Sequence, residues 1–204
     1  MSTTTRDTLL GRVRDAKDSA AWDEFFALYA PLLEGYARAS GLAPVDAEEI
    51  RDECLAVVAQ RIAEFRYDRA KGSFKGWLHA IVRGKVLDAM RRRGVRRARE
   101  ERPATEDWLS LPDDRATPDR IWEERWRAEH LRYALEEIRR SRDEEGRALV
   151  DLLLDDGLDA AEIAARSGLN ANQVYKLRSK LVREVREALA RLGETDEENP
   201  RIVG

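Results

Sequence analysis

Side chains that can read the edges of base pairs gather near the C-terminus, in a stretch with helical periodicity. Asparagine and glutamine can pair bidentately with adenine, while lysine or arginine can contact guanine or a phosphate group. The candidate residues are Asn172, Gln173, Tyr175, Lys176, Arg178, Lys180 and Arg183. Their types and spacing predict a helix that contacts DNA.

The residues just before this stretch have the pattern of a helix-turn-helix. Asp159 can cap a short helix over 160–166, Gly168 permits a turn with positive φ, and Asn170 can cap the second helix. The residues expected to close a small core are Ile163, Ala164, Leu169, Val174 and Leu177. In this motif the second helix enters the major groove with its N-terminus first. An ordinary helical hairpin with a polar face is the alternative interpretation.

A second group of residues, between positions 65 and 93, combines aromatic rings with positive charges. A glycine-containing loop precedes a helix that has aromatic residues at its start and arginines at its end. Aromatic faces stack on unpaired bases and basic groups follow the backbone, so this arrangement can hold an unstacked strand. The candidate contacts are Arg66, Tyr67, Lys71, Ser73, Phe74, Lys75, Arg83, Lys85, Arg91, Arg92 and Arg93. The helical spacing of Phe74, Trp77 and Leu78 also fits burial in a core, which is the commoner role of such residues.

The charges of the chain are segregated, although they nearly cancel to a formal net charge of −3. Residues 61–102 carry 14 basic and 5 acidic side chains, and residues 170–192 carry 6 basic and 2 acidic ones. The seven positive charges among residues 91–102 repel one another unless an anion lies nearby. Two separate contacts with a polyanion are therefore expected, with solvated helix faces as the alternative.

The composition argues against several other classes of protein. The single Cys54 excludes a disulfide framework, and one cysteine with two histidines is too few for the usual zinc site, so no metal or other cofactor is expected. Neither His79 nor His130 stands in a motif for nucleophilic catalysis, which argues against an enzyme. The chain shows no secretory signal and no apolar stretch near the roughly 20 residues of a membrane span. A cytoplasmic protein that does not contact a membrane is expected.

Helical periodicity dominates the chain, and no run of alternating β-branched residues predicts a strand. The expected fold is all-α, with two small helical domains joined by a flexible linker. The linker, residues 94–118, contains one glycine and three prolines and few periodic apolar positions. The predicted helices cover residues 19–39, with a kink or break at Pro31, 46–65 with Asp46 as cap, 74–93, 119–140, 144–155, 160–166 and 171–192.

The order of these parts resembles that of bacterial RNA polymerase sigma factors of the extracytoplasmic-function (ECF) group, within the sigma-70 family. The region 2 motif of that family is matched by Gly72, Phe74, Trp77, Leu78, Ile81, Arg83, Asp88, Arg91 and Arg92. The acidic residues 46–53 resemble the start of regions 2.1–2.2, and residues 157–174 resemble the region 4 helix-turn-helix. Gly84 departs from the pattern, because the family usually has an asparagine there.

The resemblance implies a protein that binds core RNA polymerase and promoter DNA. It implies a region 2 domain over 1–93 for the core enzyme and the −10 element, a linker over 94–118, a region 4 domain over 119–192 for the −35 element, and an acidic disordered tail over 193–204. Region 4 would meet the β flap, and an anti-sigma factor is a further partner that the family allows. Region 2 would dock on the clamp helices of the β′ subunit through Asp52, Glu53, Val57, Gln60, Arg61 and Glu64.

A stand-alone helix-turn-helix regulator is the alternative function. It explains residues 159–190 equally well, but it leaves residues 72–93 and their positive charge unexplained. The two functions differ in one requirement, because a regulator binds duplex DNA alone, whereas a sigma factor needs the polymerase.

Overall fold

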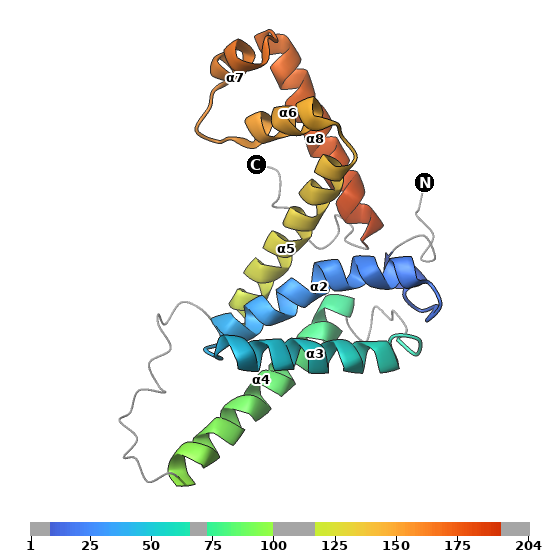
Figure 1. The fold of residues 1–204 in the computed structure, drawn as a ribbon, viewed down its shortest axis with the longest axis vertical. Helices are drawn as coiled ribbons and strands as arrows, with labels where there is room; N and C mark the ends of the chain where they lie inside the picture. Colours follow the sequence, from blue (N-terminus) through green and yellow to red (C-terminus); the bar gives the residue numbers. More distant parts are fainter. Residues whose placement is uncertain (1–8, 66–72, 100–116, 193–204) are drawn as a thin grey trace. The chain divides into compact units, whose positions relative to one another are not determined.

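The computed structural model describes residues 9–65, 73–99 and 117–192 (Figure 1). Within these ranges the chain forms eight helices and no strand, so the predicted all-α class is confirmed. They divide into two compact units, an N-terminal unit over Arg12–Glu129 and a C-terminal unit from His130 onward, with which the described residues 9–11 are grouped. The helices are α1 (Leu9–Arg12), α2 (Ser19–Ala39), α3 (Pro44–Arg61), α4 (Phe74–Arg99), α5 (Pro118–Arg140), α6 (Glu144–Leu154), α7 (Ala160–Ser167) and α8 (Ala171–Arg191).

In the N-terminal unit, α2 and α3 pack side by side and run antiparallel (Figure 1). Asp18 caps α2 by accepting a hydrogen bond from the Ala21 amide at 2.9 Å, as its residue type predicts. The predicted break at Pro31 does not occur. α2 continues through this proline to Ala39. α3 begins at Pro44, two residues before the predicted cap, Asp46. Proline suits the first position of a helix, because the N–H that it lacks would have no hydrogen-bond partner within the helix.

The core of the N-terminal unit is built from one apolar face of each helix. Burying each large side chain contributes about 1.5–3 kcal/mol, so these faces hold the helices together. From α2 to α4 the main buried residues are Phe25, Leu28, Tyr29, Leu32, Leu33, Tyr36, Ile50, Cys54, Val58, Leu78, Val82 and Val86. α4 lies against α3 and, less extensively, against α2.

Two predicted boundaries of the linker differ from the structure. α4 does not end at Arg93 but continues through Gly94 to Arg99, since one glycine inside a helix costs only about 1 kcal/mol relative to alanine. The division between the units falls between Glu129 and His130, inside α5, and not near residue 118. The first turns of α5 therefore belong to the N-terminal unit. Residues 100–116 and the predicted tail, residues 193–204, lie outside the described residues.

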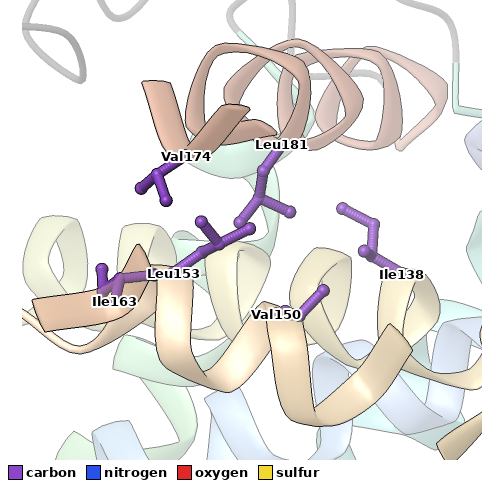
Figure 2. Close-up of a cluster of buried hydrophobic side chains, with 6 residues drawn as sticks. All are labelled: Ile138, Val150, Leu153, Ile163, Val174 and Leu181. Atoms are coloured by element: carbon purple, nitrogen blue, oxygen red, sulfur yellow. The ribbon is translucent and has the colours of Figure 1, made fainter. Parts of the chain in front are cut away.

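The C-terminal unit packs α6, α7 and α8 with the end of α5 around a small core. Figure 2 shows the buried side chains, which α5, α6, α7 and α8 all contribute. They are Ile138, Val150, Leu153, Ile163, Val174 and Leu181. Because every helix of the unit supplies at least one of them, this core fixes the angle at which α8 is presented.

Candidate nucleic-acid and polymerase interfaces

The turn between α7 and α8 has the local geometry that the sequence predicts. The Asp159 carboxylate accepts hydrogen bonds from the amides of Ala161 and Glu162 at 2.8 Å, while the Glu162 carboxylate accepts one from the Asp159 amide at 2.9 Å. This reciprocal pair is a capping box. Gly168 has a φ of 70°, a left-handed conformation that glycine adopts without a Cβ clash. The predicted cap and turn are therefore confirmed.

α8 begins with a second capping box. The Asn170 side chain accepts from the Gln173 amide at 2.9 Å, and the Gln173 side-chain oxygen accepts from the Asn170 amide at 2.8 Å. The prediction that Asn170 caps this helix is confirmed. Gln173 uses one acceptor position of its side-chain oxygen in the cap, so a bidentate contact with an adenine would compete with the capping bond.

The first turns of α8 present most of the predicted DNA contacts to solvent. Asn172, Tyr175 and Lys176 are exposed, and an open hollow at the start of the helix is lined by Asn172, Gln173 and Lys176. Lys180 and Arg183 are also exposed, each 3.9 Å from a glutamate one turn later. Exposed pairs of this kind are weak, so both cations remain able to bind a phosphate.

Arg178 makes two hydrogen bonds within the C-terminal unit, and its predicted contact with DNA would compete with them. Its Nε donates to the Leu153 carbonyl at 3.4 Å, and its Nη2 donates to the Leu158 carbonyl at 3.2 Å. These carbonyls lie at the end of α6 and in the connection to α7. Because Arg178 stands one turn after the buried Val174, its side chain turns toward the protein and ties α8 to that connection.

Of the predicted −10 contacts, Arg66, Tyr67 and Lys71 lie outside the described residues. The Ser73 hydroxyl accepts from the Gly76 amide at 3.2 Å, which is the geometry of a cap at the start of α4. Ser73 therefore serves first to begin the helix that carries the remaining basic residues.

Phe74 belongs to the core, and the prediction that it contacts DNA is wrong. It is only 5% exposed and is surrounded by other rings, with centroids 5.4 Å from Tyr29 and 5.6 Å from Trp77. Phe25, Phe65 and Trp126 complete the group. Edge and tilted contacts of this kind stabilise an aromatic cluster, and they leave no face of Phe74 for a base.

Two predicted DNA-binding lysines on α4 are already engaged by carboxylates. Lys75 Nζ lies 2.7 Å from Glu123 and 5.7 Å from the centroid of the Trp126 ring, and its side chain is only 17% exposed. Lys85 Nζ lies 2.8 Å from Glu53, a residue predicted to contact the polymerase. A phosphate that binds either lysine would compete with its carboxylate partner.

The arginines of α4 are more accessible. Arg83, Arg91 and Arg92 are exposed, and Arg91 lies 3.1 Å from Asp88 in a pair that solvent surrounds. Arg93 is partly held by the turn after α2, since it donates to the Gly41 carbonyl at 3.5 Å and lies 3.7 Å from Asp46. The exposed arginines form a positive edge along the helix.

The predicted polymerase-binding residues follow the outer side of α3. Asp52, Gln60 and Arg61 are exposed, Glu53 and Val57 are half-buried, and Glu64 is exposed just beyond the end of the helix. Two exposed acidic residues that the sequence analysis did not select, Glu48 and Glu49, precede Asp52 by four and three positions. This spacing, readable in the sequence, places them on the same face as Asp52.

Two tryptophans at the start of α5 were not predicted to be buried. Trp122 and Trp126, four positions apart, are 2% and 3% exposed and pack against α2 and α4. Their spacing is the signal for a buried stripe, although it does not reveal which helices cover it. His79 stacks on Trp122 with ring centroids 5.0 Å apart.

Other kinds of site find no support within the described residues. No group of three or more metal-binding side chains comes together there, and none of the described helices is both long and apolar enough to cross a membrane. Burial raises the pKa of the Cys54 thiol to about 12, so this buried cysteine stays protonated at neutral pH.

Comparison with known proteins identifies the family. A profile described as Sigma-70 region 2 matches residues 25–96. The chain is 28% identical over 161 residues to the ECF RNA polymerase sigma factor RpoE of Cereibacter sphaeroides, an alignment that covers 79% of this chain and 82% of that protein. It is 29% identical over 171 residues to the ECF RNA polymerase sigma factor SigE of Mycolicibacterium smegmatis, covering 84% of this chain and 62% of that protein.

A third relative has higher identity. The chain is 32% identical over 155 residues to the ECF RNA polymerase sigma factor SigF of Caulobacter vibrioides, and the alignment covers 75% of this chain and 76% of that protein. All three relatives are named as ECF RNA polymerase sigma factors. The profile match extends from within α2 to within α4 and includes the region 2 motif. The chain belongs to the ECF group of RNA polymerase sigma factors, within the sigma-70 family.

Proposed function

We propose that this sigma factor divides promoter recognition between its two units, with α4 at the −10 element and α8 at the −35 element. As an ECF sigma factor, the protein binds core RNA polymerase and directs it to promoters. The observation that carries the division is the presence of two exposed sets of DNA-binding side chains on separate units. The alternative, a stand-alone regulator, is not favoured, because it needs no region 2.

In the C-terminal unit, the start of α8 would enter the major groove. Asn172, Tyr175 and Lys176 are exposed there, where a recognition helix leads with its first residues. Each good bidentate contact contributes about 1–3 kcal/mol of discrimination between bases. Lys180 and Arg183 would follow the phosphates, while the NH₂ of Gln173 can still donate to a base.

In the N-terminal unit, α4 would follow the backbone of the −10 element. Arg83, Arg91 and Arg92 are exposed along it and would bind successive phosphates. Arg66, Tyr67 and Lys71 precede the helix, and we propose that they hold a base flipped out of the melted strand. Flipping costs a few kcal/mol, which these contacts must offset.

The polymerase contacts are proposed for faces that do not bind DNA. The outer side of α3, with Asp52, Gln60 and Arg61, would dock on the clamp helices of the β′ subunit, and the C-terminal unit would meet the β flap. An anti-sigma factor, where one exists, is expected to cover one of these surfaces. No covalent chemistry is proposed for this chain, which would act in the cytoplasm beside the polymerase.

The test is co-purification with bacterial core RNA polymerase, followed by run-off transcription from a library of promoter fragments. We expect stable binding and new promoter-specific transcripts. Asp52→Lys should weaken binding to the core enzyme, whereas Asp23→Lys, at an exposed carboxylate of α2, serves as the control of equal charge change. Retention of duplex DNA by the chain alone, without binding to the core enzyme, would instead identify a stand-alone regulator.

A further inference from the structure

The first turns of α5, residues 118–129, form part of the N-terminal unit, and we call them the docked segment. Trp122 meets the Tyr36 ring edge-on with centroids 5.5 Å apart, and Trp126 lies 5.7 Å from Tyr29. A Cβ at Gly35 would lie 3.4 Å from the Arg125 guanidinium, so the glycine allows α5 to approach α2 closely. The docked segment therefore covers parts of α2 and α4.

Docking brings carboxylates to the basic beginning of α4. Glu123 holds Lys75 at 2.7 Å, and the same lysine lies above the Trp126 ring. One turn earlier along α5, Asp119 lies 3.9 Å from His79 Nδ1. Lys75 is thus enclosed by the docked segment on two sides, with an anion as its partner and an aromatic face beside it.

We propose that the docked segment occupies, in the free chain, part of the surface of α4 that binds the promoter strand, with the Glu123 carboxylate in the place of a phosphate. This inference rests on the proposed function, which assigns α4 to the −10 element. A carboxylate and a phosphodiester both offer an anionic oxygen to the ammonium group of Lys75. Since Lys75 is largely buried by Glu123 and Trp126, the strand and the docked segment cannot both occupy this position.

The contacts of the docked segment suit an interaction that can be released. Burial of two tryptophans favours docking. The Trp122 indole N–H, however, is buried with no acceptor among the described residues, and a buried donor without a partner disfavours the docked state. The Glu123 side chain is 43% exposed, so water and competing anions can reach the ion pair with Lys75.

The test compares Glu123→Gln with Glu124→Gln in the full chain. Both changes remove one negative charge from the same helix, but Glu124 is exposed and pairs with Arg120 at 2.8 Å rather than with α4. The probe is a fluorescein-labelled oligothymidylate strand, with binding followed by fluorescence anisotropy. Glu123→Gln should raise the affinity about threefold to tenfold, the effect of one freed charge contact, and Glu124→Gln by less than about twofold.

A second substitution assigns the gain to Lys75. Lys75→Ala should remove the gain, so that the chain with both Lys75→Ala and Glu123→Gln binds the strand no more tightly than the chain with Lys75→Ala alone. Equal affinities of the two glutamine variants, or a gain that survives Lys75→Ala, would overturn the inference.

Transcription assays separate this inference from the proposed function. If the unaltered chain directs promoter-specific transcription with core RNA polymerase while the two glutamine variants bind the strand alike, the inference fails and the proposed function stands. If the unaltered chain gives no such transcription, the proposed function itself fails.

Discussion

At the scale of single residues, His79 is the titratable group most closely tied to the docked segment. Its ring stacks on Trp122 at an interplanar angle of 10°, and its Nε2 lies 3.3 Å from the Tyr36 hydroxyl. Burial lowers the pKa of His79 below its ordinary value, while Asp119 and Glu123 act to raise this pKa and Arg83 acts to lower it. The neutral imidazole is therefore the form that the packed N-terminal unit favours.

Acidification below pH 6.5 is expected to destabilise the N-terminal unit through His79. Because the pKa of His79 is lower in the folded unit than its ordinary value of 6.5, the unfolded chain binds the proton more tightly. The stabilisation is fully present above pH 6.5 and is lost as the pH falls toward the folded pKa. Urea unfolding followed by tryptophan fluorescence reports on this unit, since the tryptophans among the described residues, Trp22, Trp77, Trp122 and Trp126, all lie in it. His79→Gln should show a weaker pH dependence, and an unchanged dependence would contradict this role.

Arg178 and Lys176 are expected to respond differently to substitution by alanine. Arg178→Ala removes hydrogen bonds from a charged group to two carbonyls, so the free energy of unfolding should fall by about 1–3 kcal/mol. Lys176→Ala should leave stability unchanged, because its side chain is exposed. Thermal unfolding followed by circular dichroism makes the comparison. An Arg178→Ala variant that unfolds like the unaltered chain but loses DNA binding would instead support Arg178 as a DNA contact.

At the scale of elements, the exposed arginines at the end of α4 give the helix its proposed role. Arg91→Glu with Arg92→Glu should abolish promoter opening and leave the helical content unchanged, because both side chains are exposed. Permanganate reactivity of unpaired thymines measures opening. The control is Lys17→Glu with Arg38→Glu, an equal charge change at exposed residues around α2. Normal opening by the α4 variant, or equal loss in the control, would contradict the phosphate role.

Two glycines in different elements should respond oppositely to alanine. Gly168→Ala should destabilise the turn before α8 by about 1–2 kcal/mol, because its φ of 70° is costly for an L-residue. Gly84→Ala should stabilise α4 by about 0.5–1 kcal/mol, because Gly84 lies inside the helix and an added Cβ meets nothing within 4 Å. Thermal unfolding distinguishes them, and a stabilising Gly168→Ala would show that the turn can do without its left-handed residue.

Local signals in the sequence predicted the elements better than their partners. The caps at Asp18, Asp159 and Asn170 are correct, because a cap depends only on residues a few positions away. The helical spacing of the aromatic residues predicted that Phe74 lies on an apolar face of its helix. It did not predict that residues of α2 and α5 cover this face. Such partners come from distant segments, so periodicity alone does not reveal them.

At the scale of the whole molecule, α5 contributes to both units. Its first turns complete the N-terminal core through Trp122 and Trp126, and Ile138 near its end belongs to the C-terminal core. The sequence did not indicate that one helix contributes to both cores. The apolar periodicity of such a helix is continuous and shows no boundary between the two units. The two proposed DNA contacts nevertheless fall on separate units, as the segregated charges of the sequence suggest.

Run-off transcription with core RNA polymerase, on a promoter whose −10 and −35 elements are altered one at a time, tests the central claim most directly. Lys176→Ala should reduce transcription from the intact promoter but not from a template with an extended −10 element and an altered −35 element. Arg91→Glu with Arg92→Glu should abolish transcription from both templates. Equal loss on both templates with Lys176→Ala would contradict the assignment of α8 to the −35 element, and with it the division of promoter recognition between the two units.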